Sequence, residues 1–302
     1  MKDMSVEITP FSINDLDSVA DLFYRHGSER FSYVADIQLF KVFSSLNNWK
    51  AFLAKISGEI VGCIQALKYM FNNGWIGGLL VDKQHRRLGI GKKLLLKAMD
   101  FLGSEYIHIF VEPENIIARS LYEKAGFRLT YRRVDFLPHE ELIKGWETIS
   151  CEVSPKISFN NLSGALGFKE RQGVVQLGYY PVKIDSKVFD RLMEMNKILN
   201  YGRVIGVIEN SYICPSNGYE FHFNDYILDK IPLPRKQRIV EVNPFYMEPN
   251  IQDFIRLLQA IYTTTKATII IRTYEQDPIV KKLESMGKLQ LGALIMQFSR
   301  ES

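Results

Sequence analysis

The chain has 302 residues, of which 46% are hydrophobic and 24% are charged, and its formal net charge is +4. This length predicts about two domains, and this composition is that of a globular protein with enough apolar residues to form buried cores. The mild positive charge is dispersed along the chain, so it does not indicate a nucleic-acid-binding protein.

The cysteines and histidines indicate neither a disulfide framework nor a metal site. The three cysteines, Cys63, Cys151 and Cys214, are odd in number and far apart, and the five histidines lack metal-ligand spacing. The N-terminus has no apolar core of the signal-peptide type, and no apolar run has the length of a transmembrane helix. We therefore expect a cytoplasmic protein without a metal ion and without membrane association.

In chain order, the first half contains strands and helices that the spacing of its apolar residues predicts. The expected strands are Val6–Phe11, Trp49–Ile56, Glu59–Met70, Trp75–Val81 and Tyr106–Val111. The expected helices are a segment that Ser12 caps, then Asp36–Leu46, and then Gly91–Leu102.

The second half repeats this coarse pattern after an irregular segment, 138–172, that is rich in Ser, Asn and Gly over part of its length. The expected strands are Val174–Ile184, Gly202–Cys214, Tyr219–Asp229, Arg238–Phe245, Ala267–Arg272 and Leu291–Phe298. The expected helices are Ser186–Leu199, Ile251–Tyr262 and Asp277–Met286. The sequence therefore predicts two domains, 1–137 and 173–302, with 138–172 as a linker.

The most informative stretch is VDKQHRRLGIGKKLL, from Val81 to Leu95, which joins an expected strand to an expected helix. Gly89 and Gly91 allow the backbone to curl tightly, and the helix that follows presents unpaired N–H groups to the curl. Such a helix start is a site for phosphate or pyrophosphate. Without further evidence, the stretch fits equally well an ordinary strand-to-helix turn.

A second motif, ENIIARSLYEKAGFRL, follows the strand that ends at Val111. The two motifs in this order resemble those of the Gcn5-related N-acetyltransferase (GNAT) family over roughly the first 135 residues. The resemblance implies an α/β fold of the GNAT acyl-CoA N-acyltransferase type with acetyl-CoA as the co-substrate. By the order of its elements the C-terminal half resembles a second, diverged GNAT-like domain, with Gly287 aligned on Gly126.

The resemblance also implies which residues hold acetyl-CoA. The strand at Leu79, Leu80 and Val81 would contact the pantetheine and the thioester, and the loop would bind the pyrophosphate. The residues of this loop and its helix start are Arg86, Arg87, Leu88, Gly89, Ile90, Gly91 and Lys92, and those of the second motif are Asn115, Ala118 and Tyr122. Asn115 would bond the pantetheine arm or cap its helix, and both roles are compatible.

For catalysis, the resemblance places a general acid at Tyr122, a phenol that can protonate the leaving thiolate. The alternative is an aromatic residue that packs against Phe127. Many family members carry a glutamate as general base where this chain has Gly77. Glu112 is a weak substitute, and a water chain, the second domain or the substrate itself are equally open sources of the base.

The second half lacks an equivalent loop, since VNPFYMEPNIQD (Val242–Asp253) contains no glycine and two prolines. We therefore expect one acetyl-CoA site per chain, and a second domain that shapes the substrate cleft or forms a homodimer face. We also expect a fragment that ends near Asp135 to retain acetyl-CoA binding. The activity implied is acetyl transfer from acetyl-CoA to a primary amine of a small molecule or protein, and the alternative is a catalytically inactive acyl-CoA-binding regulatory or scaffolding protein.

Overall fold

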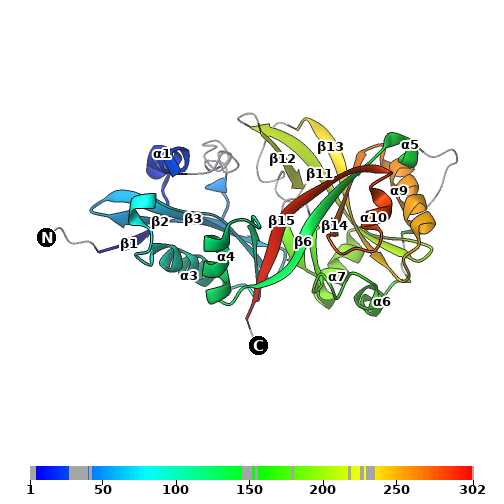
Figure 1. Ribbon diagram of the computed structural model, residues 1–302, viewed down its shortest axis with the longest axis horizontal. Coiled ribbons are helices and arrows are strands. Elements are labelled where there is room, and N and C mark those ends of the chain that lie inside the picture. The colour runs from blue at the N-terminus through cyan, green and yellow to red at the C-terminus, as the bar shows by residue number, and fades with distance from the viewer. Residues whose placement is uncertain are drawn as a thin grey trace.

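The computed structural model describes residues 5–26, 40, 43–144, 152–153, 156–177, 180–216, 219–224, 228 and 235–300. Figure 1 shows an elongated molecule with the N-terminal half at one end and the C-terminal half at the other. Most of the expected helix Asp36–Leu46 lies outside the described residues. Within the described residues, no helix is both long enough and apolar enough to cross a membrane.

Within the described residues, the first half has the five strands that the sequence predicts and the expected helices after Ser12 and after the glycine loop. Its strands are β1 (Glu7–Pro10), β2 (Trp49–Ile56), β3 (Glu59–Tyr69), β4 (Asn73–Val81), β5 (Tyr106–Val111) and β6 (Arg128–Pro138). Its helices are α1 (Leu16–His26), α3 (Ile90–Leu102) and α4 (Ile116–Lys124), with short 3-10 turns η1 (Ile13–Asp15) and η3 (Lys83–His85). The helix α3 buries Leu94, Leu95, Ala98 and Leu102 against the sheet, as the helical period requires.

The second half contains more elements than the sequence predicts. Its strands are β7 (Glu152–Val153), β8 (Val174–Leu177), β9 (Tyr180–Lys183), β10 (Ile198–Tyr201), β11 (Val204–Ser216), β12 (Tyr219–Asn224), β13 (Gln237–Tyr246), β14 (Thr268–Tyr274) and β15 (Gly287–Ser299). Its helices are α5 (Glu140–Ile143), α6 (Phe159–Gly164), α7 (Ser186–Glu194), α9 (Ile251–Thr265) and α10 (Val280–Leu283).

Three predicted elements of the second half were wrong in extent. The expected strand Val174–Ile184 is two antiparallel strands, β8 and β9. The expected helix Ser186–Leu199 ends at Glu194, because Asn196 adopts a left-handed conformation (φ 53°) that asparagine tolerates, and β10 begins two residues later. The expected helix Asp277–Met286 shortens to α10, because the Asp277 side chain first accepts the N–H of Ile279 in a turn.

One mixed sheet runs through the whole molecule. Among the described residues it has thirteen strands in the order β1-β2-β3-β4-β5-β15-β6-β14-β13-β11-β10-β7, and β12 pairs with β11 beside this path. The last strand, β15, therefore lies between β5 and β6 of the first half, and it is antiparallel to both. On its other edge β6 pairs with β14. Figure 1 shows β6 and β15 running together across the middle of the molecule.

The two halves also share an apolar core on one face of this sheet. The cluster contains Val19 and Leu22 of α1, Leu177 and Tyr180 of the β8–β9 hairpin, and Phe189 of α7. A separate cluster on the other face of the first half lies under α3 and α4. The mixed α/β fold is thus confirmed, and both the sheet and one core continue across the predicted boundary at residues 137–138. The division into two domains remains a proposal.

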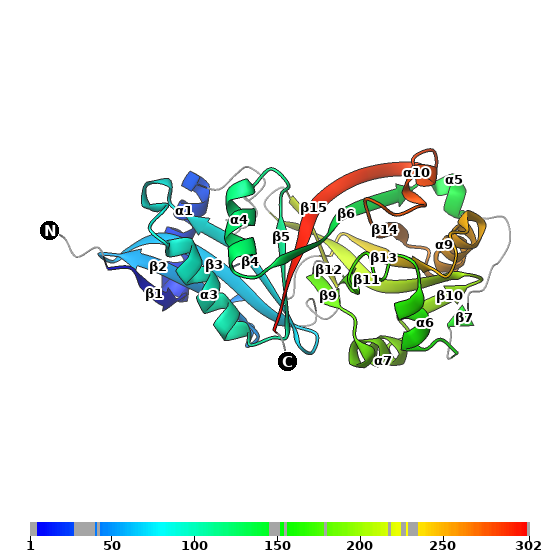
Figure 2. The same cartoon turned by 60° about the horizontal axis from the view of Figure 1, so that its bottom comes forward.

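The β8–β9 hairpin lies between the halves (Figure 2). An asparagine from each half holds it. Asn73 of β4 accepts the N–H of Lys183 at 2.8 Å and donates to its carbonyl at 3.4 Å. Asn243 of β13 likewise accepts the N–H of Gln176 at 3.3 Å and donates to its carbonyl at 2.8 Å. Both asparagines are almost fully buried, so these bonds fix the hairpin against both halves.

Candidate active site

The strands β4 and β5 pair over only part of their length, and we call the unpaired stretch between them the slot. Their parallel pairing runs from Asn73↔Tyr106 to Ile76↔Ile109 and stops there. Beyond that point β4 carries one extra residue relative to β3, and Gly78 takes a left-handed conformation (φ 60°). The bulge bends β4, and residues 77–80 form no ladder with β5, so their backbone on that side can pair with an extended ligand.

The predicted strand residues lie along this slot. Leu79 and Val81 pack against the core under α3, whereas Leu80 packs against the shared core on the opposite face. The carbonyl of Val81 accepts a hydrogen bond from Nε of Arg86 at 3.1 Å. This bond ties the start of the glycine loop to the end of the slot.

The glycine loop forms an exposed curl at the mouth of the slot. Asp82 caps η3 by accepting the N–H of Gln84 at 2.8 Å, and Arg87 and Gly89 follow with φ of 64° and 76°. Gly89 is the N-cap of α3, and Ile90 is 1% exposed and anchors the helix start in the core.

The residues of the loop that stay exposed are Arg86, Arg87, Leu88, Gly89 and Lys92. The first N–H groups of α3 have no partner within the helix, and Arg86, Arg87 and Lys92 are exposed in the adjacent loop and first turn. This is the arrangement that binds a pyrophosphate.

The two glycines act in different ways. A Cβ at Gly89 would meet nothing within 4 Å, so space does not require a glycine there. The positive φ of this residue favours glycine, because residues with a Cβ rarely adopt it. A Cβ at Gly91 would lie 3.4 Å from Cδ2 of Leu121 and 3.8 Å from Cγ2 of Val81. These are ordinary van der Waals distances, so the packing of α3 alone would accept a Cβ at position 91.

The second motif forms α4, on the same side of the sheet as α3. Asn115 is its N-cap, and Oδ1 of Asn115 accepts the N–H of Ala118 at 3.1 Å. The capping role is therefore observed, and a bond from the Asn115 amide to a ligand remains a proposal. Ala118 is partly buried against the core of the first half.

Tyr122 is buried in α4, with 7% of its surface exposed. Its ring lies 6.0 Å from that of Phe127, and burial raises the pKa of its phenol above the usual value. The phenol stays protonated at neutral pH, which a general acid requires. The same packing also fits a core residue, so the geometry is compatible with both interpretations. Glu112 is partly buried just after β5, where its carbonyl accepts the N–H of Asn115 at 3.0 Å.

The strand position at Gly77 is covered by an aromatic side chain. A Cβ on Gly77 would lie 2.2 Å from Cζ2 of Trp75, so the indole lies directly over this glycine. No other side chain than that of glycine fits here while the indole keeps this position. Gln65 of β3 pairs with Gly77, and its Oε1 accepts the indole N–H of Trp49 at 3.3 Å. Among the described residues, no group of three or more His, Cys, Asp or Glu is placed to hold a metal ion.

Comparison with known proteins identifies the family. Residues 16–127 match the acetyltransferase (GNAT) family. An uncharacterized N-acetyltransferase of Methanocaldococcus jannaschii is 32% identical over 125 residues, which are 40% of this chain and 77% of that protein. The chain belongs to the GNAT acetyltransferase family. The family predicted from the two motifs is thus confirmed, and with it N-acetyltransferase chemistry of the GNAT type.

Other relatives share a shorter region with this GNAT chain. An N-alpha-acetyltransferase of Sulfurisphaera tokodaii is 35% identical over 92 residues, 26% of this chain and 55% of that protein. Human N-alpha-acetyltransferase 30 is 37% identical over 91 residues, 27% of this chain and 25% of that protein. Among solved structures, the PaiA N-acetyltransferase of Thermoplasma acidophilum in complex with coenzyme A has a TM-score of 0.36 and 22% identity, over 42% of this chain and 91% of that chain. The chain thus spans about half or less of these two N-alpha-acetyltransferases.

The second half of this GNAT chain has a slot of the same kind, but the chain itself fills it. β13 and β14 also pair in parallel over four residues, from Ile239↔Thr268 to Val242↔Ile271. Beyond that point the Arg171 guanidinium donates to the carbonyls of Pro244 on β13 and Arg272 on β14. Arg171 is fully buried, and its guanidinium carbon lies 3.9 Å from the centroid of the Phe245 ring.

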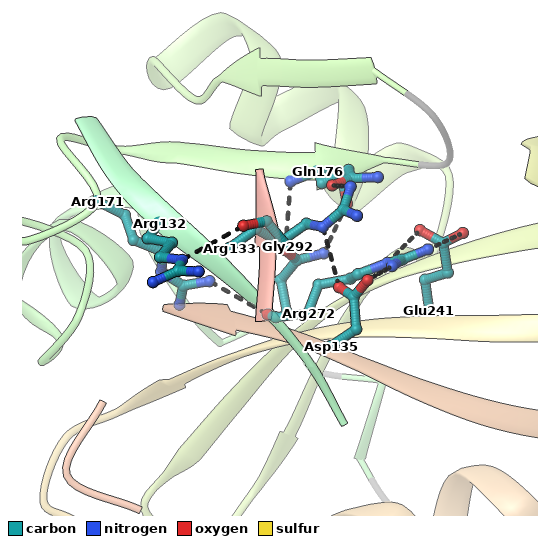
Figure 3. Close-up of polar contacts among 9 residues, drawn as sticks. Arg132, Arg133, Asp135, Arg171, Gln176, Glu241, Arg272 and Gly292 are labelled. Atoms are coloured by element: carbon teal, nitrogen blue, oxygen red, sulfur yellow. Dashed lines mark hydrogen bonds and ion pairs between the residues drawn. The ribbon is translucent and has the colours of Figure 1, made fainter. Parts of the chain in front are cut away.

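A buried ion network crosses from β6 to the second half beside this slot (Figure 3). Nη1 of Arg272 lies 2.6 Å from Oδ2 of Asp135, and its Nη2 lies 3.3 Å from Oε1 of Glu241. Burial disfavours the charge of Arg272, but Asp135 and Glu241 outweigh it and raise the pKa of the guanidinium. Arg133 bridges Asp135 and the side chain of Gln176 on the hairpin. Removing one partner would leave an uncompensated charge in the interior.

Sequence reasoning missed the residues on the shared-core face of the slot. Trp75 gave a weak signal, because it stands two residues before Gly77 on one face of a strand. Tyr180 of β9 gave none, because its contact with Trp75 depends on the position of the hairpin. Arg171 lay within the segment 138–172 that was interpreted as a linker.

Proposed function

We propose that the first half transfers an acetyl group from acetyl-CoA to a primary amine. The observation that carries the proposal is the combination of the β4–β5 slot with an exposed, positively charged helix start at its mouth. The pyrophosphate would bind the N–H groups from Arg87 to Gly91, with Arg86 and Lys92 nearby. The pantetheine arm would extend along Leu79, Leu80 and Val81, so that the thioester lies toward Gly77.

In the proposed reaction the neutral amine attacks the thioester carbonyl carbon, and the C–S bond then breaks. Tyr122 donates its phenol proton to the leaving thiolate, and the proton of the amine passes to water or to Glu112. The Tyr122 phenol carries its proton at neutral pH and therefore has one to donate. Since Gly77 offers no side-chain base, the amine must lose its proton by another route.

This condition favours weakly basic amines as acceptors. An α-amino group has a pKa of roughly 7.7–8.0 and a lysine side chain one of about 10.4. At pH 7 roughly 9–17% of the α-amino groups are neutral, compared with about 0.04% of the lysine amines. Together with the relatives that are N-alpha-acetyltransferases, this supports the α-amino group of a peptide or protein as the acceptor.

The second candidate function is an acyl-CoA-binding protein without catalysis, and the indole over Gly77 favours it. Calorimetry with acetyl-CoA, followed by an assay of free thiol release over a panel of peptides and small amines, separates the two. Binding with turnover on at least one amine supports the enzyme. Binding without turnover on any amine supports the second candidate, and no binding refutes both.

A further inference from the structure

The point where β4 leaves β5 is covered on one side by a single side chain. Ile76 is the last residue of β4 that pairs with β5, and Gly77 is the first residue of the slot. The Trp75 indole lies over Gly77 and is only partly buried. An amine that approaches a thioester at this end of the slot from the shared-core face therefore meets the indole.

The indole is held in place by the second half. Tyr180 of β9 is 2% exposed, and its ring packs edge-on against Trp75 with 5.4 Å between centroids. Tyr69 of β3 supports the other side of Tyr180, with 5.1 Å between the rings. Aromatic pairs at these separations are attractive and geometrically selective. Moving Tyr180 would release the indole from its position over the slot.

The position of Tyr180 depends in turn on both halves of the chain. Lys183, three residues further along β9, is held by Asn73, and Gln176 of the adjacent strand is held by Asn243. His108 of β5 is paired with Trp75 across the sheet and is fully buried. The indole therefore lies between Gly77 and the hairpin, on the face of the sheet where His108 is its neighbour.

We propose that Trp75 forms the wall of the acceptor site and that Tyr180 is a positioning residue for acyl transfer. This inference rests on the proposed function. The second half, whose slot is filled by Arg171, then acts on the reaction of the first half through the contact between the Tyr180 and Trp75 rings. An indole wall excludes water from the attacking amine and favours an acceptor whose group next to the amine is apolar.

The test uses the full chain with three single-residue variants. Tyr180→Leu removes the ring but keeps apolar volume, Tyr180→Phe keeps the ring, and Phe189→Leu is a matched change in the same core away from Trp75. For each protein we would measure acetyl-CoA affinity by calorimetry, kcat and KM for the best peptide acceptor, and tryptophan emission. Misplacement of a reacting group by about 1 Å can lower a rate by about 100-fold.

Tyr180→Leu is expected to lower kcat/KM for the amine by at least about tenfold, to shift tryptophan emission to the red, and to leave acetyl-CoA affinity unchanged. Tyr180→Phe should restore both the rate and the emission, and Phe189→Leu should change neither. Equal losses in Tyr180→Leu and Phe189→Leu would overturn the positioning role, as would a Tyr180→Leu protein with wild-type kinetics. A wild type that acetylates no amine would instead refute the proposed function, and the inference would fall with it.

Discussion

Deletion of the last strand should destroy the proposed acetyl-CoA site of the first half, although that site lies more than 150 residues earlier in the chain. A chain that ends at Met286 lacks β15, which pairs with β5 from Leu294↔Val111 to Ser299↔Tyr106 and also with most of β6. Its loss exposes one edge of each strand in the middle of the sheet. We therefore expect β5, which forms one side of the slot, to lose its place.

The size of this effect follows from the side chains that β15 buries. Leu294, Ile295 and Met296 are 7%, 0% and 1% exposed. Burial of one such side chain contributes about 1.5–3 kcal/mol, so the three contribute roughly 5–9 kcal/mol. The free energy of unfolding of a typical domain is roughly 5–15 kcal/mol. The truncated chain should therefore be unfolded or close to its unfolding midpoint at 25 °C.

The assay is calorimetry with acetyl-CoA together with thermal unfolding followed by circular dichroism. A chain that ends at Arg300 is the matched control, because it keeps all of β15. The same reasoning reverses the expectation that a fragment ending near Asp135 binds acetyl-CoA, since that fragment also lacks β15. A truncated chain that unfolds cooperatively and binds acetyl-CoA with wild-type affinity would refute this account of the sheet.

Three further predictions concern single residues. Gly91→Val should weaken acetyl-CoA binding in calorimetry, because its added carbons crowd Leu121 and the loop that would approach the pyrophosphate. Tyr122→Phe should lower turnover by about 100-fold in the thiol-release assay, with acetyl-CoA affinity unchanged, because the ring still packs against Phe127. His108→Gln should reduce the acid sensitivity of stability, measured by urea unfolding at pH 7 and pH 4.5. Burial lowers the pKa of His108 from 6.5 to about 4, so the unfolded chain binds a proton between these values that the folded chain does not. The wild type should thus lose up to about 3 kcal/mol as the pH falls through this window, and it should keep full stability above it.

Each of these has a contrary outcome, and the loop variant also has a matched control. Gly103→Ala, at the other end of α3, should cost some stability, because Gly103 has a φ of 57°, but should not change acetyl-CoA affinity. If Gly91→Val binds as the wild type does, the loop is not the site. Wild-type turnover of Tyr122→Phe, with chemistry rate-limiting, would remove the phenol from the mechanism. Parallel stability profiles for His108→Gln and the wild type would mean that other groups control the acid response.

The first half could be predicted from the sequence because its signals are local. The loop with Gly89 and Gly91 lies between a strand and a helix that the apolar period reveals, and Asn115 stands at a helix start. These features depend on neighbours within a few residues. The family and the fold class followed from them and are confirmed.

The second half was predicted less well because its elements depend on distant contacts. β8 and β9 are each four residues long, and Asn73 and Asn243, which lie far from them in sequence, hold them in place. The position of β15 between β5 and β6 has no local signature, since the strand could pair at several edges of a mixed sheet. Tertiary contacts, rather than propensity, decide both.

The two slots show how one architecture can bind a ligand in one half and exclude it in the other. Counted from the last paired residue of each strand, Pro244 corresponds to Gly78. Proline has no N–H, so the filled slot presents carbonyls that need donors. Arg171 offers only donors, and its guanidinium contacts carbonyls of both strands that border the slot. The open slot keeps Gly78, whose backbone can both donate and accept, as the amide groups of an extended ligand require. The two slots therefore differ in which backbone groups still need a hydrogen-bond partner. This difference explains why only the first half should bind acetyl-CoA.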